Sequence, residues 1–209
     1  TEANLTNAIM IDADLTGANL TGATLHIANM ENAKLVGAGL TNADLTEANL
    51  KFANMTEANL TNAIMIDADL LQANLTGANL TNANLLDANL LEANLTDANL
   101  TNADLTNTMM NFSDLTNVNL TNANLTGTSM FMTDVTTANL TYVSSLYIEL
   151  CPEYKPPNWV CISKHFLGPG MNLTGKNLAG LNLQGIYLVG ADLADATLFF
   201  SNFSKANLS

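Results

Sequence analysis

The fold is decided by residues 73–105, which read ANLTGANLTNANLLDANLLEANLTDANLTNADL. This stretch repeats a pattern of five residues in which Ala and Leu stand two positions apart. The spacing extends in both directions, so that Leu, Met or Val fills all 28 positions in steps of five from Leu5 to Leu140. Ala fills all 21 matching positions from Ala3 to Ala103, and mainly Asn, Asp, Thr and Gly lie between.

A period of five residues fits neither an α-helix nor a flat strand. On a helix, five residues advance by about 500°, which would scatter the Ala and Leu pairs over every face. On a strand, an odd repeat would send successive leucines to opposite faces. The leucines stay on one side only if the chain bends in every repeat, and Asn, Asp and Gly favour bends. The sequence therefore predicts an all-β chain that coils, with its coils stacked about 4.8 Å apart.

The runs Ala-Asn-Leu-Thr-Asn and Ala-Asp-Leu-Thr-Glu resemble the A-[DN]-L-x-x motif of the pentapeptide-repeat family. The resemblance covers residues 1–140 and about 171–209. It implies a right-handed quadrilateral β-helix, a solenoid with four repeats in each coil, Leu stacks inside and Ala beside the bends. Residues 1–140 would then form about seven coils, and residues 171–209 about two more.

Residues 141–170 interrupt the repeat, and the register after them has moved by three, with Leu173, Leu178 and Leu183 as the next centres. This segment holds the single tryptophan, both cysteines and all four prolines. We therefore expect three parts: a β-helix over 1–140, a non-repeat insertion over 141–170 and a second repeat block over 171–209. Because the end of a coil stack needs covering, we expect the insertion to pack against the last coils and to shield Trp159.

The two cysteines, Cys151 and Cys161, bracket the segment CPEYKPPNWVC. A disulfide across this loop is the simplest interpretation, and it would indicate an oxidising compartment. Two alternatives stay open. The thiols could be free, or they could join His165 in a zinc site, although the spacing matches no standard pattern and a fourth ligand is missing.

Sorting the outward residues by coil separates several faces. One face displays apolar side chains, and contiguous apolar patches more often mark an interface than incidental exposure; its members are Phe52, Leu71, Leu91, Met109, Phe112, Phe131 and Met132. A second face stacks Thr21 to Thr121 beside Asn42 to Asn122, which predicts side-chain ladders or, alternatively, an ordered surface that binds a periodic ligand. A third feature is the acidic column Glu47, Asp67 and Asp87, whose carboxylates either splay into solvent or invite a cation.

The composition restricts the classes of function. The net charge is −13 and the chain contains no arginine, which excludes a basic groove for nucleic acid. No apolar run approaches the ~20 residues of a membrane span. No phosphate-binding loop, HExxH motif or nucleophile elbow occurs, so we expect neither an enzyme nor a cofactor.

Two functional hypotheses follow. The first is a non-catalytic structural or protein-interaction module, monomeric, with an unidentified protein partner. The cysteines favour the thylakoid lumen or the periplasm over the cytoplasm, and the resembling family includes exported and lumenal members in cyanobacteria. The second, favoured by the negative charge, is an acidic DNA mimic that binds a type II topoisomerase, as some members of the resembling family do.

Overall fold

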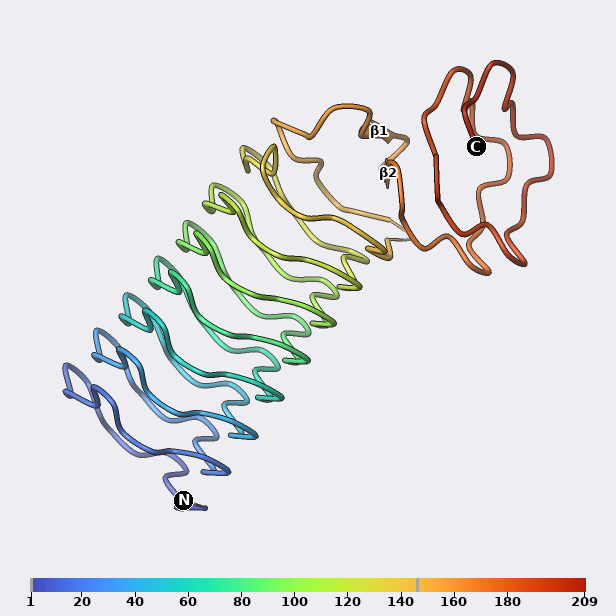
Figure 1. Ribbon diagram of the computed structural model, residues 1–209. Coiled ribbons are helices and arrows are strands. Elements are labelled where there is room, and N and C mark those ends of the chain that lie inside the picture. The colour runs from blue at the N-terminus through green and yellow to red at the C-terminus, as the bar shows by residue number, and fades with distance from the viewer. Residues whose placement is uncertain (1, 146) are drawn as a thin grey trace.

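The computed structural model describes residues 2–145 and 147–209, and its chain winds into a stack of coils (Figure 1). In the regular coils, parallel backbone bridges join residues that are 20 positions apart, as in Asn59 to Asn79 and Asn79 to Asn99. The bridging positions recur every five residues, so four sides make one coil. This arrangement is the solenoid that the five-residue period predicts.

A turn forms each corner of a coil. The amide of Ala83 donates to the carbonyl of Leu80 at 2.9 Å, three residues earlier, and Asn82 between them has a φ of 58°. A positive φ at the third residue is the mark of a type II turn, which Gly and Asn favour. Ahead of the turn, the side-chain oxygen of Asn79 accepts hydrogen bonds from the Thr81 amide (3.1 Å) and hydroxyl (2.6 Å). Successive residues of one repeat thus bridge to the neighbouring coil, pack in the core and form the corner turn.

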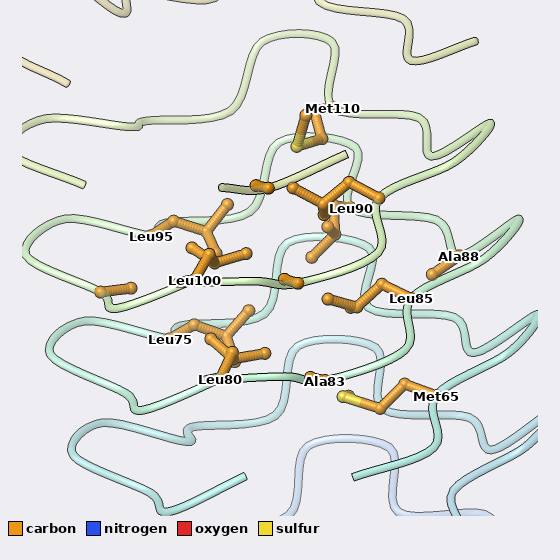
Figure 2. Close-up of a cluster of buried hydrophobic side chains, with 14 of the residues drawn as sticks. Met65, Leu75, Leu80, Ala83, Leu85, Ala88, Leu90, Leu95, Leu100 and Met110 are labelled. Carbon is orange, nitrogen blue, oxygen red and sulfur yellow. The ribbon is translucent and has the colours of Figure 1, made fainter. Parts of the chain in front are cut away.

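The core is a set of Leu and Met stacks that run along the axis, as Figure 2 shows for Leu80 and Leu100 and their neighbours. Side chains at the Leu position from Leu25 to Leu125 are at most 1% exposed, and the alanines beside the turns are equally buried. Where Thr replaces Ala, its hydroxyl is satisfied locally; that of Thr108 donates to the carbonyl of Leu105 at 2.8 Å. The backbone closes the stack, since the Leu80 amide donates to Asn99 in the next coil at 2.7 Å.

The regular turns continue to Ser145, five residues past the expected boundary at 140. Leu150 then bridges to Ser129 and Tyr154 to Asp134, so residues 141–145 and 147–154 form most of an eighth coil. The sequence hides this coil for two reasons. Ser145 stands where the repeat requires Leu, and one extra residue enters between the bridges to Asn124 and Ser129. The insertion proper is therefore shorter than 141–170.

The insertion ends in a small antiparallel hairpin of β1 (Val160–Ile162) and β2 (His165–Leu167). A disulfide joins Cys151 of the eighth coil to Cys161 of β1, with 6.3 Å between the Cα atoms. Trp159 precedes the hairpin and packs on Phe166, with ring centroids 4.7 Å apart. Gly168 lies so close to the indole that a Cβ there would overlap it. Trp159 is 7% exposed, which confirms the expected shielding.

The second repeat block adjoins the long stack through one side only (Figure 1). Asn172 bridges to Ser144, and the Tyr142 amide donates to the carbonyl of Gly170 at 2.7 Å. Within the block the 20-residue pairing resumes, as in Asn177 to Thr197. Across the described residues, the amides of Asn177, Asn182 and Tyr187, which face back toward the long stack in this register, have no hydrogen-bond partner. We call this one-sided connection the seam.

We predict that Leu80→Ala destabilises the protein much more than Thr81→Ala. The first change opens a cavity in a fully buried stack and should cost about 2–5 kcal/mol. The second removes the Thr81 hydroxyl, which donates to Asn79 and accepts from Asn99, and should cost about 1 kcal/mol. Denaturant melts followed by circular dichroism measure both, and equal losses would contradict this assignment of inward and outward positions.

We predict that the unreduced protein contains no free thiol. A thiol count on the denatured, unreduced chain should give zero, and the same count after reduction should give two. Two thiols before reduction would disprove the Cys151–Cys161 bond and remove the reason for placing the protein in an oxidising compartment.

We predict that acrylamide quenches the fluorescence of Trp159 slowly, because Phe166 and Gly168 cover the indole. This is the single tryptophan, so the signal needs no assignment. The quenching constant should fall well below that of free N-acetyl-tryptophanamide, and it should rise when the disulfide is reduced. Quenching as fast as the free indole would mean that the insertion does not pack on the coils.

Candidate functional site

The seven residues of the predicted apolar face come from three columns along one side of the stack. On this side, the inward side chains are Met10, Met30, Leu50 and their equivalents every 20 residues. The three columns hold the residue before each of these and the two residues after it. Phe52, Met109, Phe131 and Met132 are 43–46% exposed and Phe112 is 52% exposed. Leu71 and Leu91 are half-buried.

Four of the seven residues gather on two successive coils. The amide of Phe112 donates to the carbonyl of Phe131 at 2.9 Å, and their rings meet edge to face with centroids 5.6 Å apart. Met109 and Met132 flank this pair along the chain. We call these four residues, Met109, Phe112, Phe131 and Met132, the Phe–Met cluster.

The eighth coil extends the cluster by a residue that the sequence did not reveal. Leu150 bridges to Ser129, the next residue after Met109 in its column, and is 44% exposed. The extra residue in this coil shifts Leu150 off the 20-residue spacing, so counting alone misses it. Leu150 is followed in the chain by Cys151, the first cysteine of the disulfide.

The remaining members of the face do not join the cluster. Lys51 forms an ion pair with Asp69 at 3.0 Å beside Phe52. Between Phe52 and Phe112 in their column stand Gln72 and Glu92, which are joined by a 2.5 Å hydrogen bond. Phe52, Leu71 and Leu91, which lie on successive coils, thus form a separate apolar group, and the more exposed cluster lies at the C-terminal end of the face.

Two members of the cluster occupy unfavourable corners. Phe112 has a φ of 59° and Met132 a φ of 58°. A left-handed backbone costs about 1–2 kcal/mol for an ordinary residue, and bulky side chains adopt it rarely. Asn and Gly fill half of the equivalent corners of the long stack at lower cost, and Asp and Glu fill most of the others. Ile27, Phe52 and Tyr142 occupy such corners as well, but Phe112 and Met132 are the two that follow each other on neighbouring coils of one column.

The Thr and Asn face satisfies its own hydrogen bonds. The side-chain amide nitrogen of Asn62 donates to the side-chain oxygen of Asn42. In the same way, the side chain of Asn82 donates to that of Asn62 and the side chain of Asn102 to that of Asn82, all at 2.9–3.0 Å. The threonine hydroxyls are also engaged, since that of Thr101 donates to Asn99 and accepts from Asn119. These ladders hold the coils together, as the first of the two interpretations predicts.

Several aspartates serve as turn acceptors. Asp114 accepts from the hydroxyl of Thr116 at 2.6 Å and its amide at 2.9 Å, and these hydrogen bonds hold the pKa of Asp114 below its ordinary value. In the acidic column, Asp87 accepts from the Asn107 amide at 3.0 Å. Over residues 2–145 and 147–209, no three His, Cys, Asp or Glu side chains are arranged to hold a metal ion.

The zinc alternative is wrong, because the two cysteines are bonded to each other and supply no thiolate. Nδ1 of His165 lies 2.9 Å from the carbonyl oxygen of Ser163.

The structure also reveals an exposed pair that sequence reasoning missed, Phe199 and Phe200, which are 73% and 98% exposed at a corner of the last coil. The sequence could have revealed this pair, because two aromatic residues stand at positions where the repeat usually has Thr and Asn.

No helix capable of crossing a membrane occurs in the described parts of the chain.

Comparison with solved structures returns other coil stacks. HetL, a protein involved in heterocyst differentiation regulation in the cyanobacterium Nostoc sp. PCC 7120, is 28% identical, with 98% of this chain and 89% of HetL covered and a TM-score of 0.52. QnrB1, a plasmid-mediated fluoroquinolone resistance protein, is 16% identical over 95% of this chain and 83% of its own, with a TM-score of 0.51. The second likeness shows the fold alone. A search of curated protein sequences finds no match.

The family model for pentapeptide repeats matches the chain in eight copies, which cover residues 1–37, 25–62, 53–90, 73–111, 110–141 and 172–209. The gap between the last two matches contains the disulfide and the hairpin. Proteins of this kind fold as right-handed β-helices and are generally structural or interaction proteins. The chain therefore belongs to the pentapeptide-repeat family.

Proposed function

We propose that this protein is a non-catalytic protein-interaction module of an oxidising compartment, and that the Phe–Met cluster is its contact surface. The observation that carries the proposal is the meeting of Phe112 and Phe131 on the outside of the stack. Aromatic and methionine side chains are enriched at the centres of protein interfaces, and charged side chains are depleted there. The cluster contains only such apolar residues, and Leu150 enlarges it.

The backbone cost of the cluster supports the same conclusion. Phe112 and Met132 lie at corners where Asn or Gly would be more stable, so the stack gains nothing from them. The disulfide beside the cluster supports the compartment, because such bonds persist in the thylakoid lumen or the periplasm and are rare in the cytoplasm.

The histidines support a non-catalytic role. Nδ1 of His26 lies 3.1 Å from the carbonyl of Thr46, and Nδ1 of His165 contacts the Ser163 carbonyl. A catalytic histidine needs a nucleophile or an orienting carboxylate within hydrogen-bond reach. Among the described residues, neither ring forms a hydrogen bond with a nucleophile or a carboxylate.

The net charge of −13 favours the second candidate, a DNA mimic that binds a type II topoisomerase. A mimic needs carboxylates that are free to imitate phosphates. Among the described residues, seven of the 19 acidic side chains use an oxygen to hold the turn that follows them, and these are Asp14, Asp44, Asp69, Asp104, Asp114, Asp134 and Asp192. We therefore rank the mimic second.

The test replaces cluster residues by those that the repeat uses elsewhere. In the double variant Phe112→Asn and Phe131→Thr, both positions receive side chains that the repeat uses at the equivalent positions on other sides of the coil, so thermal stability should be unchanged or higher. Affinity for the partner should fall by more than tenfold, as expected when two aromatic anchors are removed. The wild-type protein, with its disulfide intact, would first be used to capture a partner, and the affinity would then be measured by calorimetry with that partner purified.

The matched control is Ile27→Asn, which replaces an apolar residue 44% exposed at a corner with a φ of 55° on another face. It should leave binding unchanged. Equal binding by the double variant would refute the cluster as the contact surface. Inhibition of gyrase supercoiling by the wild-type protein at micromolar concentration would refute the module and favour the mimic.

A further inference from the structure

The seam contains a gap in the sheet with a defined register. Ser144 bridges to Asn172 and Asn172 to Asp192 along one side. On the preceding side, five residues earlier, the matching positions are Asn139, Leu167 and Tyr187. Leu167 belongs to β2 and pairs with Val160 instead, so one strand of the stack is missing between the coil edge at 138–140 and the coil edge at 186–188.

The missing strand leaves four backbone groups without partners. In an intact coil, Asn139 donates its amide to Val118 below, and its carbonyl accepts from the Leu120 amide. By the same pattern, an added strand would accept a hydrogen bond from the Leu140 amide and donate one to the Ala138 carbonyl. On its other edge, it would accept a hydrogen bond from the Tyr187 amide and donate one to the Tyr187 carbonyl. All four groups lack a hydrogen bond among the described residues.

A cavity of about 410 Å³ lies at this gap. Ala138 and Leu140 line it from the long stack, Val189 from the second block, and Pro156, Trp159 and Pro169 from the insertion. No lining side chain is charged. The polar side chain of Asn139 is already satisfied, because it accepts from the amide of Thr141 and donates to Thr121. The unmet hydrogen-bonding capacity is therefore on the backbone.

We propose that this gap binds an extended, uncharged peptide segment of a partner protein, which completes the stack by adding the missing strand. Three residues in parallel orientation satisfy the four free backbone groups, as strand addition does at other sheet edges. The apolar lining selects an apolar side chain at the inward position, where Leu stands in every regular coil. A charged segment would lose its hydration without gaining a partner.

The site is separate from the Phe–Met cluster, which lies on another side of the coils. It extends the interaction role to a second surface with a chemical specificity of its own. The two proposals rest on different residues, so either can fail without the other.

The probe is the capped peptide acetyl-Thr-Ala-Asn-Leu-Thr-amide, which copies residues 137–141. It is added to the full-length, disulfide-bonded protein. We expect a saturable change in Trp159 fluorescence with a Kd of about 1 mM or tighter, and slower hydrogen exchange at the Leu140 and Tyr187 amides. The same peptide with an N-methyl group on Asn cannot donate to Ala138 and should bind about tenfold more weakly or worse.

The protein control compares two substitutions at equivalent corner positions of the second block. Val189→Glu places a charge at the cavity and should abolish the response, whereas Ala179→Glu lies at an exposed corner elsewhere and should leave it intact. Equal binding of the N-methylated peptide would overturn the proposal, since it would reduce the effect to apolar contact with Trp159. Unchanged exchange at Leu140 and Tyr187 under saturating fluorescence change would overturn it as well.

Discussion

The stack depends on a turn that places one residue in the left-handed region of backbone space in every repeat. For residues other than glycine this conformation costs on the order of 1 kcal/mol, and each coil contains four such corners. The hydrogen bonds between coils and the burial of eight inward side chains per coil, four at the Leu position and four at the Ala position, offset that cost. The constraint explains why Asn and Gly recur at the corners and why the second block uses Gly175, Gly180, Gly185 and Gly190 there. It also identifies Phe112 and Met132 as costly choices.

A stack of this kind is nearly one-dimensional, because each coil contacts only the coils on either side. A change on the outside of one coil is felt little by the others. The surface can therefore vary from coil to coil while the Leu and Ala positions do not. This separation lets the Phe–Met cluster arise on two coils of an otherwise polar side. It also concentrates irregular structure at one place, where the hairpin enters between coils.

Much of this architecture can be predicted from the sequence because one rule repeats. The inward Leu stacks, the outward Thr and Asn columns and the exposure of Phe112 and Phe131 all follow from counting in steps of five and twenty. Counting fails where the rule is broken locally. Ser145 hides the eighth coil, one extra residue displaces Leu150, and the pairing of Leu167 with Val160 decides which backbone groups stay free. These features depend on tertiary register, which a single repeat unit does not encode.

The one-sided seam gives the molecule an uneven response to mechanical load. Along the regular coils, tension parallel to the axis is shared by hydrogen bonds on all four sides. At the seam the backbone bonds that cross from one block to the other are on the side of Tyr142, Val143 and Asn172. A rod built this way is stiff along most of its length and yields first at one joint. The two terminal coils would swing away as a unit about residues 142–144, while the covalent loop through the disulfide-linked insertion keeps them tethered.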